Sequence, residues 1–257
     1  MCTRCSFIGG LAAFALAPAV ASARTGDPQA LELAVPRMQR INDTVWLAQL
    51  TSNVWIHTTT HLLDGKIYYP ANGLIVVDGR DATLVDTAWS PDQMRALVSA
   101  WDALGKARIS KAVVTHFHSD RLGGIPYLQQ RGIPAYGNPT TIGLAVDRGF
   151  TPPKPVHELD RRPQNLGSLE LFFPGAGHTI DNIVVWVPAD GVLFGGCLVK
   201  ATTASDLGNL ADADVTAYAA TMQRLISRYR PRHVIPGHGT ISGDSLEHTL
   251  DLARTQK

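Results

Sequence analysis

His116 and His118 alternate with Asp120 in a His-x-His-x-Asp motif. The motif follows the apolar run Ala112–Thr115, which has the pattern of a buried strand that ends at a loop. In an extended loop, alternate side chains point the same way, so two imidazoles and a carboxylate can meet at one point. Such a set suits a borderline Lewis acid such as zinc. The spacing therefore predicts a metal site.

Three further side chains of ligand type stand in glycine-rich turns after apolar, strand-like runs: His178, Cys197 and His238. The neighbouring glycines let the backbone turn sharply and approach an ion closely. With the first motif they supply four His, one Asp and one Cys, enough for two metal ions. A structural zinc site is a closed set of four ligands, whereas three ligands per ion leave room for water and substrate. A lone histidine is more often a hydrogen-bonded core or surface residue, but the whole set favours a catalytic metal centre.

Size and composition favour one globular domain. The chain has 257 residues, of which 45% are hydrophobic and 18% charged. The formal net charge is +1 and the basic residues form no cluster, so we expect no nucleic-acid partner.

The N-terminus has the pattern of a secretory signal peptide. Residues 1–4 are positive, residues 7–20 are apolar, and Ala21-Ser22-Ala23 is a small-x-small cleavage site. We expect cleavage after Ala23, which leaves residues 24–257 as a single domain exported to a bacterial periplasm. The apolar stretch is short for a membrane span, so we expect no membrane association of the mature form. The alternative is an N-terminal anchor that stays attached.

Cysteine usage agrees with export. Cys2 and Cys5 precede the apolar stretch, which argues against a lipid anchor, and cleavage removes both. Cys197 then remains as the single thiol, so no internal disulfide can form. A buried, inert thiol is one interpretation of Cys197. Its place in a Gly-Gly turn favours metal ligation instead.

Strands and helices alternate in two similar halves, which predicts two sheets face to face with helices outside. The expected strands are Val45–Gln49, Val54–Thr58, Leu74–Val77, Thr83–Asp86, Ala112–Thr115, Leu169–Phe173, Ile183–Val187, Val192–Phe194 and His233–Ile235. The expected helices are Pro91–Leu104, capped by Ser90, then Gly124–Arg131, Pro139–Asp147, Asp214–Tyr229 and one that starts near Asp244. Residues 24–40 are expected to form a loose leader.

The segment Thr58–Pro70 lies between two of these strands, and Asp64-Gly65 marks the tip of a hairpin. Its apolar side chains are Leu62, Leu63, Ile67 and Tyr68. Apolar side chains on an exposed loop indicate a flap over an apolar ligand. Packing on the surface of the protein itself is the alternative.

These motifs resemble those of the metallo-β-lactamases, specifically the dizinc class B, subclass 1 enzymes, and cover roughly residue 45 to the C-terminus. The matching segments are Leu84-Val-Asp-Thr-Ala-Trp89, His116-x-His-x-Asp120, Arg121-x-Gly-Gly124, Gly177-His-Thr179, Asp181-Asn182, Gly195-Gly-Cys-Leu-Val-Lys200, the block 207–214 and Pro236-Gly-His-Gly239. The block from Cys197 to Asn209 is similar to that of the New Delhi and imipenemase-type carbapenemases. The resemblance implies an α/β (α+β) fold, an αββα sandwich with the active site at one rim of the two sheets.

The resemblance also implies a division of the ligands between two zinc ions. His116, His118 and His178 would hold the first, and Asp120, Cys197 and His238 the second, with a hydroxide between them. Zinc lowers the pKa of bound water from 15.7 toward about 7, which supplies a nucleophile without a serine. Arg121 and Cys197 separate the chain from glyoxalase II and its relatives, which have a His and a metal-bridging Asp at these positions.

Further roles follow from the same resemblance. Lys200 would pair with the substrate carboxylate, and Asp120 would orient the hydroxide. Asn209 would donate to the lactam carbonyl or stabilise its own loop. Asp86 and Arg121 would hydrogen-bond around the second metal's ligands, although Asp86 can equally cap a strand end. Trp89 would lie near the cleft floor or in the core. The remaining histidines, treated as structural or surface residues, are His57, His61, His157, His233 and His248.

The implied activity is zinc-dependent hydrolysis of the β-lactam amide in penicillins, cephalosporins and carbapenems, which would confer antibiotic resistance. The partner is then a small molecule, and we expect a monomer. The alternatives are another dizinc hydrolase, of thioesters, lactones or phosphoesters, and a zinc-binding module without activity. A serine mechanism is excluded, because neither Ser-x-x-Lys nor Gly-x-Ser-x-Gly occurs.

Overall fold

The computed structural model describes residues 38–63, 67–241 and 243–256, and within them thirteen strands form two sheets. The first sheet contains β1 (Gln39–Asn42), β2 (Val45–Gln49), β3 (Val54–Leu63), β4 (Ile67–Asp78), β5 (Asp81–Val85), β6 (Arg108–Val113), β7 (Ala135–Gly137) and β8 (Lys154–Pro155), in that order. The second has the order β13 (His233–Pro236), β12 (Val192–Gly196), β11 (Val184–Val187), β10 (Leu169–Phe172) and β9 (Gln164–Leu166).

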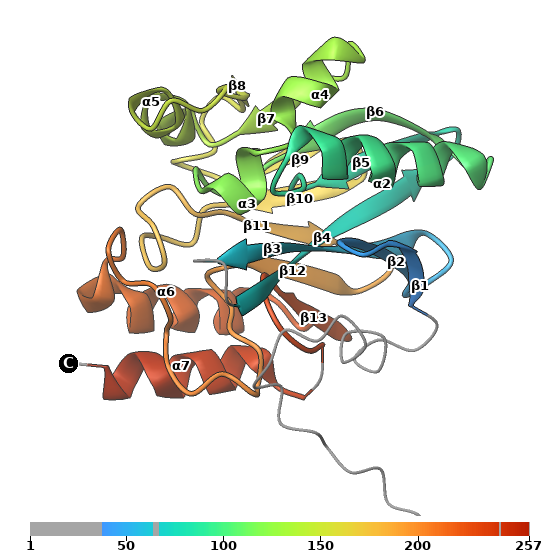
Figure 1. The fold of residues 1–257 in the computed structure, drawn as a ribbon. Coiled ribbons are helices and arrows are strands. Elements are labelled where there is room, and N and C mark those ends of the chain that lie inside the picture. Colours follow the sequence, from blue (N-terminus) through green and yellow to red (C-terminus); the bar gives the residue numbers. More distant parts are fainter. Residues whose placement is uncertain (1–37, 64–66, 242, 257) are drawn as a thin grey trace, which may run out of the picture.

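Helices cover both outer faces of the paired sheets (Figure 1). On the first sheet lie α2 (Pro91–Ala103), α3 (Ser119–Leu122), α4 (Ile125–Gln130) and α5 (Pro139–Asp147). On the second lie α6 (Val215–Arg228) and α7 (Ser245–Thr255). Neighbouring strands from β1 to β5 are antiparallel. Helix α2 then connects β5 to β6, which lies parallel to β5. The αββα sandwich expected from the resemblance is confirmed.

Three separate cores fill the interfaces between these four layers. Trp101 and Leu97 of α2 pack on the first sheet, Ile56 and Phe194 meet between the sheets, and Tyr218 of α6 packs under the second sheet. Neighbouring residues of one strand point into different cores. In β4, for example, Leu74 and Val76 belong to the core between the sheets, and Ile75 belongs to the core under α2. Burial on both faces explains why the strands are continuous apolar runs.

Local sequence signals set the helix starts. The Ser90 hydroxyl accepts a hydrogen bond from the Gln93 amide, and Pro91 takes the first helical position of α2. Asp214 caps α6 in the same way, by accepting from the Ala217 amide. The predicted ranges of α2 and α6, Pro91–Leu104 and Asp214–Tyr229, differ from the observed ranges by at most one residue at each end.

The predicted flap lies on the expected hairpin, but its strands are longer than expected. Strands β3 and β4 stay paired from Val54↔Val76 to Leu63↔Ile67, whereas the sequence predicted strands that end at Thr58 and begin again at Leu74. Residues 64–66, which include the expected tip, lie outside the described residues. Strands this long persist because the base of the hairpin is buried: Thr58, Thr59 and Thr60 are at most 1% exposed.

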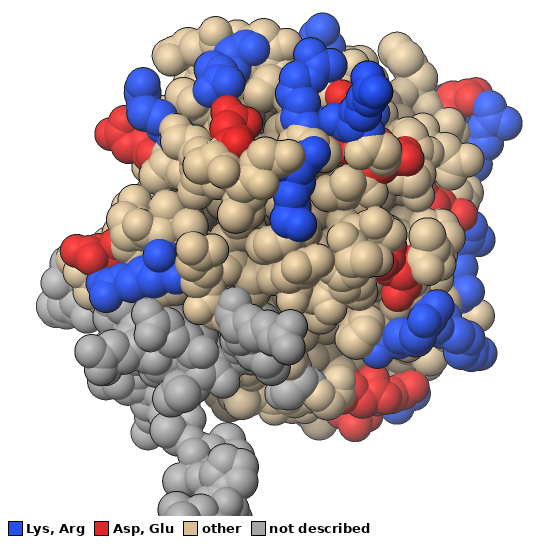
Figure 2. All heavy atoms as spheres, turned by 90° about the vertical axis from the view of Figure 1, so that its right-hand side faces the viewer, with Lys and Arg blue, Asp and Glu red and all other residues tan. Residues whose placement is uncertain are grey.

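The expected loose leader is wrong at its end, because Gln39 and Arg40 pair with β2 as part of β1. The earlier leader positions and the expected signal segment 1–23 lie outside the described residues. Among the described helices, none is long and apolar enough to cross a membrane. On the face drawn in Figure 2, acidic side chains lie among the basic ones.

Candidate metal centre

The six predicted ligands come from four segments at one rim of the sandwich. His116, His118 and Asp120 follow β6, His178 lies between β10 and β11, Cys197 follows β12 and His238 follows β13. One detail differs from the sequence prediction. Asp120 lies in the first turn of α3 rather than in an extended loop, because the chain becomes helical at Ser119.

Two glycines permit the turns that carry Cys197 and His238 to touch. Gly196 has a φ of +54°, a conformation that glycine adopts without strain. A Cβ at Gly237 would lie 2.5 Å from the Cys197 amide nitrogen, so only glycine fits between the two turns. The Gly237 amide donates to the Gly196 carbonyl at 2.8 Å, which joins the turns directly.

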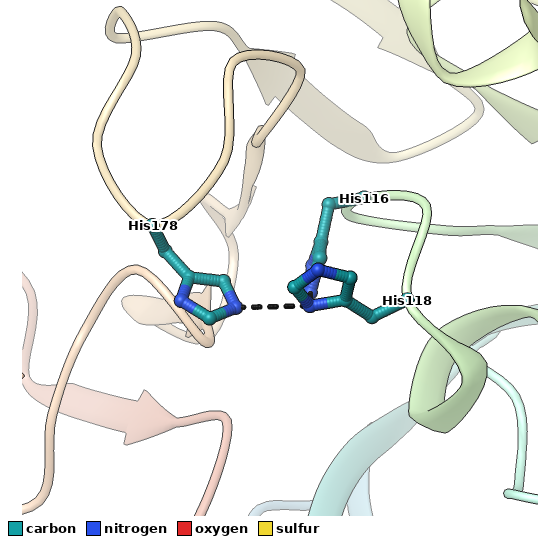
Figure 3. Close-up of side chains that lie close together, drawn as sticks. All are labelled: His116, His118 and His178. Atoms are coloured by element: carbon teal, nitrogen blue, oxygen red, sulfur yellow. Dashed lines mark hydrogen bonds between the residues drawn. The ribbon is translucent and has the colours of Figure 1, made fainter. Parts of the chain in front are cut away.

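Three imidazoles converge in the first group (Figure 3). His118 Nδ1 lies 3.1 Å from His116 Nε2 and 3.2 Å from His178 Nε2. Burial lowers the pKa of His116 and of His178 well below the usual value. The neighbouring rings lower the pKa of His116 further, and Lys200 and then His118 do so for His178. These rings are therefore neutral at pH 7, and their inward nitrogens form a cluster with more lone pairs than protons. A cation with nitrogen ligands fits this cluster.

The orientation of His118 is set from outside the cluster. Its Nε2 lies 3.0 Å from Oδ2 of Asp212, a carboxylate that can only accept, so Nε2 carries the proton and Nδ1 offers its lone pair inward. Sequence reasoning assigned no role to Asp212, although it lies in the block 207–214 that carried the resemblance.

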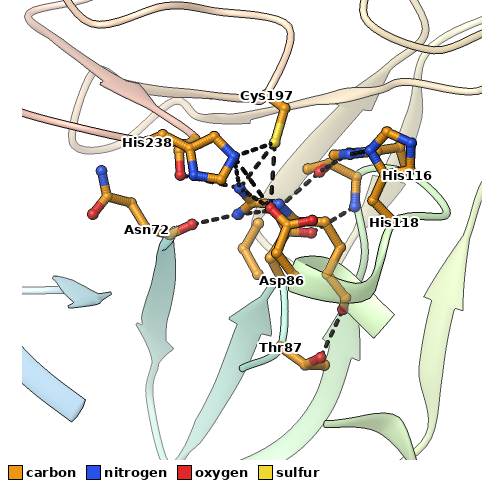
Figure 4. A network of polar contacts seen from close by, with 12 residues as sticks. Asn72, Asp86, Thr87, His116, His118, Cys197 and His238 are labelled. Atoms are coloured by element: carbon orange, nitrogen blue, oxygen red, sulfur yellow. Dashed lines mark hydrogen bonds and ion pairs between the residues drawn. The ribbon is translucent and has the colours of Figure 1, made fainter. Parts of the chain in front are cut away.

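The second group joins Asp120, Cys197 and His238. Figure 4 shows Cys197 and His238 pointing toward one another. His238 Nε2 lies 2.9 Å from Cys197 Sγ and 3.3 Å from Asp120 Oδ2, and Sγ lies 3.4 Å from the same oxygen. His116, Asp120 and Cys197 also offer ligand atoms within 4.8 Å of one another, as do the three histidines of the first group. The two groups are therefore adjacent, as two ions sharing one cleft require.

Arg121 lies beneath the second group with no exposed surface. Its Nη2 donates to Asp120 Oδ2 at 2.7 Å and to Cys197 Sγ at 3.0 Å. Its Nη1 donates to the Asn72 carbonyl at 2.6 Å and to Asp86 Oδ2 at 3.1 Å. The side chain thus contacts two predicted ligands, as sequence reasoning expected.

The charges around Arg121 support one another. Burial raises the pKa of the Asp120 carboxyl, but Arg121 and His238 outweigh burial and hold that pKa well below its usual value. Burial opposes the charge on Arg121, yet Asp120, Cys197 and Asp86 keep the pKa of Arg121 above its usual value. The pair therefore stays ionised.

The Cys197 thiol has the opposite tendency. Burial raises its pKa far above the usual value, although Arg121 acts in the other direction. A divalent cation deprotonates a coordinating thiol outright. The donor set of Asp120, Cys197 and His238, with a guanidinium behind it, thus fits a metal ion better than it fits an unligated thiol.

Asp86 supports the centre from behind. Its Oδ1 accepts from the Thr115 amide at 2.7 Å, and its Oδ2 accepts from the Thr115 hydroxyl at 2.9 Å and from Arg121. Burial raises its pKa to about 6, against the effect of Arg121. Asp86 does not contact the predicted ligands through these bonds. It holds Arg121, which bonds Asp120 and Cys197, and it holds Thr115, the neighbour of His116. The same carboxylate bonds Thr115, just after the end of β6, and the guanidinium beneath the second group, so its role at the site stays a prediction.

Lys200 and Asn209 lie on the segment between β12 and α6. Lys200 Nζ donates to the Cys197 carbonyl at 2.8 Å, and burial lowers the pKa of this amine. Asn209 is exposed, and its Oδ1 accepts from the Ala211 amide at 3.0 Å, a contact within its own loop. Because the Asn209 side-chain oxygen accepts this bond, the side-chain nitrogen is the atom that could donate to a ligand.

The hairpin β3–β4 extends beside the second group. Leu62, Leu63 and Tyr68 are 40%, 38% and 38% exposed, whereas the side chain of Ile67 lies outside the described residues. Trp89 is half-buried at the base of the hairpin, where its ring stacks on His61 with the centroids 5.1 Å apart.

Three supporting groups were not found from the sequence. The Tyr69 ring lies 4.6 Å from the His238 ring and edge-on to Trp89. The Pro70 carbonyl accepts from His238 Nδ1 at 2.6 Å. Asn72 Nδ2 donates to the Pro236 and Gly239 carbonyls on either side of His238. No residue type or spacing marks them, because strand β4 meets the His238 turn only in the folded chain.

Among the described residues, the other histidines belong to neither group of predicted ligands. His57 is buried, with Nε2 3.3 Å from the Val85 carbonyl, and His248 Nε2 lies 2.8 Å from the Ala204 carbonyl. His157 and His233 are exposed.

Comparison with known proteins agrees with this geometry. The model of the Metallo-beta-lactamase superfamily matches residues 68–238. The chain is 39% identical over 218 residues to a metallo-beta-lactamase type 2 of Bacillus sp. (strain 170), an alignment that covers 82% of this chain and 83% of the relative. A metallo-beta-lactamase type 2 of Bacteroides fragilis is 37% identical over 225 residues, covering 83% of this chain and 87% of the relative.

Solved structures give the same result. Metallo-beta-lactamase FIM-1 from Pseudomonas aeruginosa, in its mono-zinc form, superposes with a TM-score of 0.78 at 36% identity, covering 82% of this chain and 95% of FIM-1. A metallo-beta-lactamase from Erythrobacter litoralis superposes with a TM-score of 0.78 at 36% identity, covering 85% of this chain and all of the other. Taken with the fold and the two groups of donor atoms, these matches show that the chain belongs to the metallo-β-lactamase superfamily.

Proposed function

We propose that this protein hydrolyses the amide bond of β-lactam antibiotics with two zinc ions. The observation that carries the proposal is the convergence of donor atoms from both sheets into two adjacent groups. Ligand atoms lie within 4.8 Å of one another in the triad of His116, His118 and His178 and in the triad of His116, Asp120 and Cys197. Similarity to named metallo-beta-lactamases of two genera over more than four fifths of the chain supports the substrate class.

His116, His118 and His178 would hold the first ion, and Asp120, Cys197 and His238 the second. When bound, zinc supplies Lewis acidity and a hydroxide at neutral pH. Three neutral imidazoles leave the first position fully cationic, so it suits a carbonyl oxygen. The carboxylate and thiolate reduce the charge at the second position, which suits an anionic leaving nitrogen. The asymmetry of the donors thus matches the two ends of the amide bond that breaks.

The chain's own residues orient the reaction. Asp120 Oδ2 is fixed by Arg121 at 2.7 Å, so this carboxylate can accept a proton or a hydrogen bond from the nucleophile at a defined place. The Lys200 ammonium, now bonded to the Cys197 carbonyl, would exchange that partner for the carboxylate of a bicyclic β-lactam. The Asn209 amide would donate to the lactam carbonyl through its nitrogen, since its oxygen is held by Ala211.

The hairpin and the cellular context complete the proposal. Leu62, Leu63, Ile67 and Tyr68, with Trp89 at the base, would cover apolar substituents of penicillins, cephalosporins and carbapenems, in keeping with the subclass 1 resemblance. Residues 1–23 would direct the chain to the periplasm, where β-lactams act, and the mature domain 24–257 would work there as a monomer that confers resistance.

The test is hydrolysis by the purified domain that begins at Arg24. With zinc added, we expect it to open benzylpenicillin, a cephalosporin and imipenem, as followed by loss of lactam absorbance, and we expect EDTA to stop the reaction. His116→Asn should abolish turnover, whereas His157→Asn, at an exposed histidine away from the site, should leave it unchanged. Zinc-loaded protein that leaves all three substrates intact would reject the function.

A further inference from the structure

Arg148, at the C-terminal end of α5, reaches across to the segment before α6. Its Nη2 lies 2.7 Å from Oδ1 of Asp212, whose other oxygen lies 3.0 Å from His118 Nε2. One carboxylate therefore joins a guanidinium to a predicted metal ligand. In Figure 1, α5 and α6 lie in opposite outer layers, so this contact joins the two halves of the chain over the site.

A second contact reaches the same ligand through its neighbour. The guanidinium carbon of Arg148 lies 5.1 Å from the centroid of the Phe117 ring, a cation–π distance. That ring is 2% exposed, and its centroid lies 4.6 Å from the centroid of the His118 ring. Arg148 thus borders the His118 ring from two sides, through the Asp212 carboxylate and through Phe117.

We propose that Arg148 is a positioning residue for the first metal site, which fixes Asp212 so that His118 keeps its proton on Nε2 and its Nδ1 lone pair toward His116 and His178. This inference rests on the proposed dizinc function. A carboxylate alone can rotate, and its two oxygens are equivalent. When the Arg148 guanidinium holds Oδ1 of Asp212, the position of Oδ2 is fixed as well. The His118 imidazole, which donates to Oδ2, then loses rotational freedom.

The expected effect is selective. Removing a group that orients a ligating histidine costs about tenfold to 100-fold in metal affinity. Arg148 acts one step further away and its side chain is 53% exposed, so we expect Arg148→Gln to weaken the first site by about threefold to tenfold. The second site, with Asp120, Cys197 and His238, should keep its affinity, because none of these residues bonds to Asp212 or Arg148 in the described residues.

The chain offers a matched control in Arg131. It also ends a helix, α4, lies 3.3 Å from a carboxylate, Asp102, and sits 5.9 Å over an aromatic ring, Tyr127. Its side chain is 45% exposed, close to that of Arg148. These partners lie away from the metal centre. Arg131→Gln therefore removes an equivalent surface interaction and should leave both zinc affinities unchanged.

The experiment measures zinc affinity by competition with a chromophoric chelator, in wild type, Arg148→Gln, Asp212→Ala, the double variant and Arg131→Gln. Circular dichroism first establishes that each variant folds. We expect Arg148→Gln to weaken the first site only, Asp212→Ala to weaken it more, and the double variant to match Asp212→Ala, since Arg148 acts through Asp212. Nitrogen-15 spectra of the zinc-loaded protein should show a slowly exchanging His118 Nε2 proton that exchanges faster in Arg148→Gln.

Additive effects in the double variant would overturn the inference, as would equal weakening of both sites or affinities unchanged by Arg148→Gln. If Arg148→Gln does not fold, Arg148→Lys, which keeps the charge but not the planar fork, carries the same test with the same outcomes. These readouts need no β-lactam. Failure of the proposed function, zinc binding without lactam hydrolysis, is therefore distinguishable from failure of this inference.

Discussion

Arg121 carries a full positive charge in a place from which water is excluded, and it is the counter-charge for Asp120 and Asp86. An unpaired charge at such depth would cost several kcal/mol, so these three groups depend on one another. The same guanidinium reaches Cys197, which has its pKa raised by burial. The pKa values of Asp120, Arg121 and Cys197 are therefore set largely by burial and by the neighbouring charges.

Cys197→Ser should weaken the second metal site by more than about tenfold, because loss of a ligand costs at least as much as loss of a group that orients one. A hydroxyl is a poorer donor and stays mostly protonated. We expect turnover to fall with the second zinc while the first zinc remains. Metal analysis together with kcat checks this. Two zinc ions per chain at the wild-type rate would exclude Cys197 as a ligand.

His57 should make the metal-free protein less stable in acid. Burial lowers its pKa from 6.5 to about 4, so the folded state binds the proton more weakly than the unfolded state. Its contribution is therefore present above pH 6.5 and is lost as the pH falls toward 4, a change of about 3 kcal/mol. Urea unfolding in EDTA at pH 7.5 and 4.5 measures this loss.

In that experiment, His57→Gln should reduce the loss of stability between the two pH values, and His157→Gln, at an exposed position, should not. Protonation of His116 and His178 also lowers the free energy of unfolding in acid. That contribution is the same in wild type and in both variants, so it cancels in the comparison. Equal losses in wild type and His57→Gln would contradict the assignment.

Strands β3 and β4 are paired from Val54↔Val76 to Leu63↔Ile67, with one end in the core and the other beside the predicted ligand His238. Near the base of this hairpin, the Pro70 carbonyl holds His238 Nδ1 and the Tyr69 ring packs on His238. Further along, Leu62 and Leu63 are close to 40% exposed. The hairpin thus carries, on one piece of secondary structure, contacts to the predicted ligand His238 and an exposed apolar surface.

Replacing both Leu62 and Leu63 by Ser should raise KM for β-lactams with apolar side chains by about threefold to tenfold, because a lost aliphatic contact costs about 1 kcal/mol. Zinc content and Tm should stay near wild type, since exposed substitutions change stability little. Val146→Ser, at a 58% exposed position on α5, is the control. Unchanged KM in the Leu variant would show that the hairpin does not touch substrate.

The candidate metal centre draws its side chains from both sheets. Three predicted ligands follow β6 of the first sheet, and three lie on segments of the second. Ions bound there would connect the two halves of the sandwich at one rim, next to the core between the sheets. A ligand that binds only the folded state raises the free energy of unfolding by about 4 kcal/mol when its free concentration is 1,000 times the dissociation constant.

Removing zinc with EDTA should therefore lower the Tm by about 10 °C or more, given about 2–4 °C per kcal/mol for a domain of this size. Differential scanning calorimetry with and without EDTA measures the shift. In Cys197→Ser the shift should be smaller, because one ion is already bound weakly. A Tm that does not respond to EDTA in wild type would mean that the ions do not bind the folded state with this affinity.

Sequence patterns determined the elements because the signals for them are local. The apolar runs at Val45–Gln49 and Val192–Phe194, and the Ser90-Pro91 start of α2, act within a few residues, and the structure confirms these elements. The patterns failed where local signals were weak: β1 is polar, β7 has three residues, and the strands of the expected hairpin run further toward its tip than predicted. Residue types also named the six predicted ligands, since histidine, cysteine and aspartate in glycine-rich turns have few other uses together.

Only the tertiary structure decided what surrounds those ligands. Asn72 and Pro70 reach the His238 turn across more than 160 positions of sequence, and Asp212 reaches His118 across 94. Such contacts use ordinary amides, carbonyls and carboxylates, which occur throughout any chain and carry no local pattern. Their partners are fixed by the packing of two sheets, a property of the whole molecule. For that reason the chemistry could be read from the sequence, whereas the support that holds it in place, Arg148 included, required the fold.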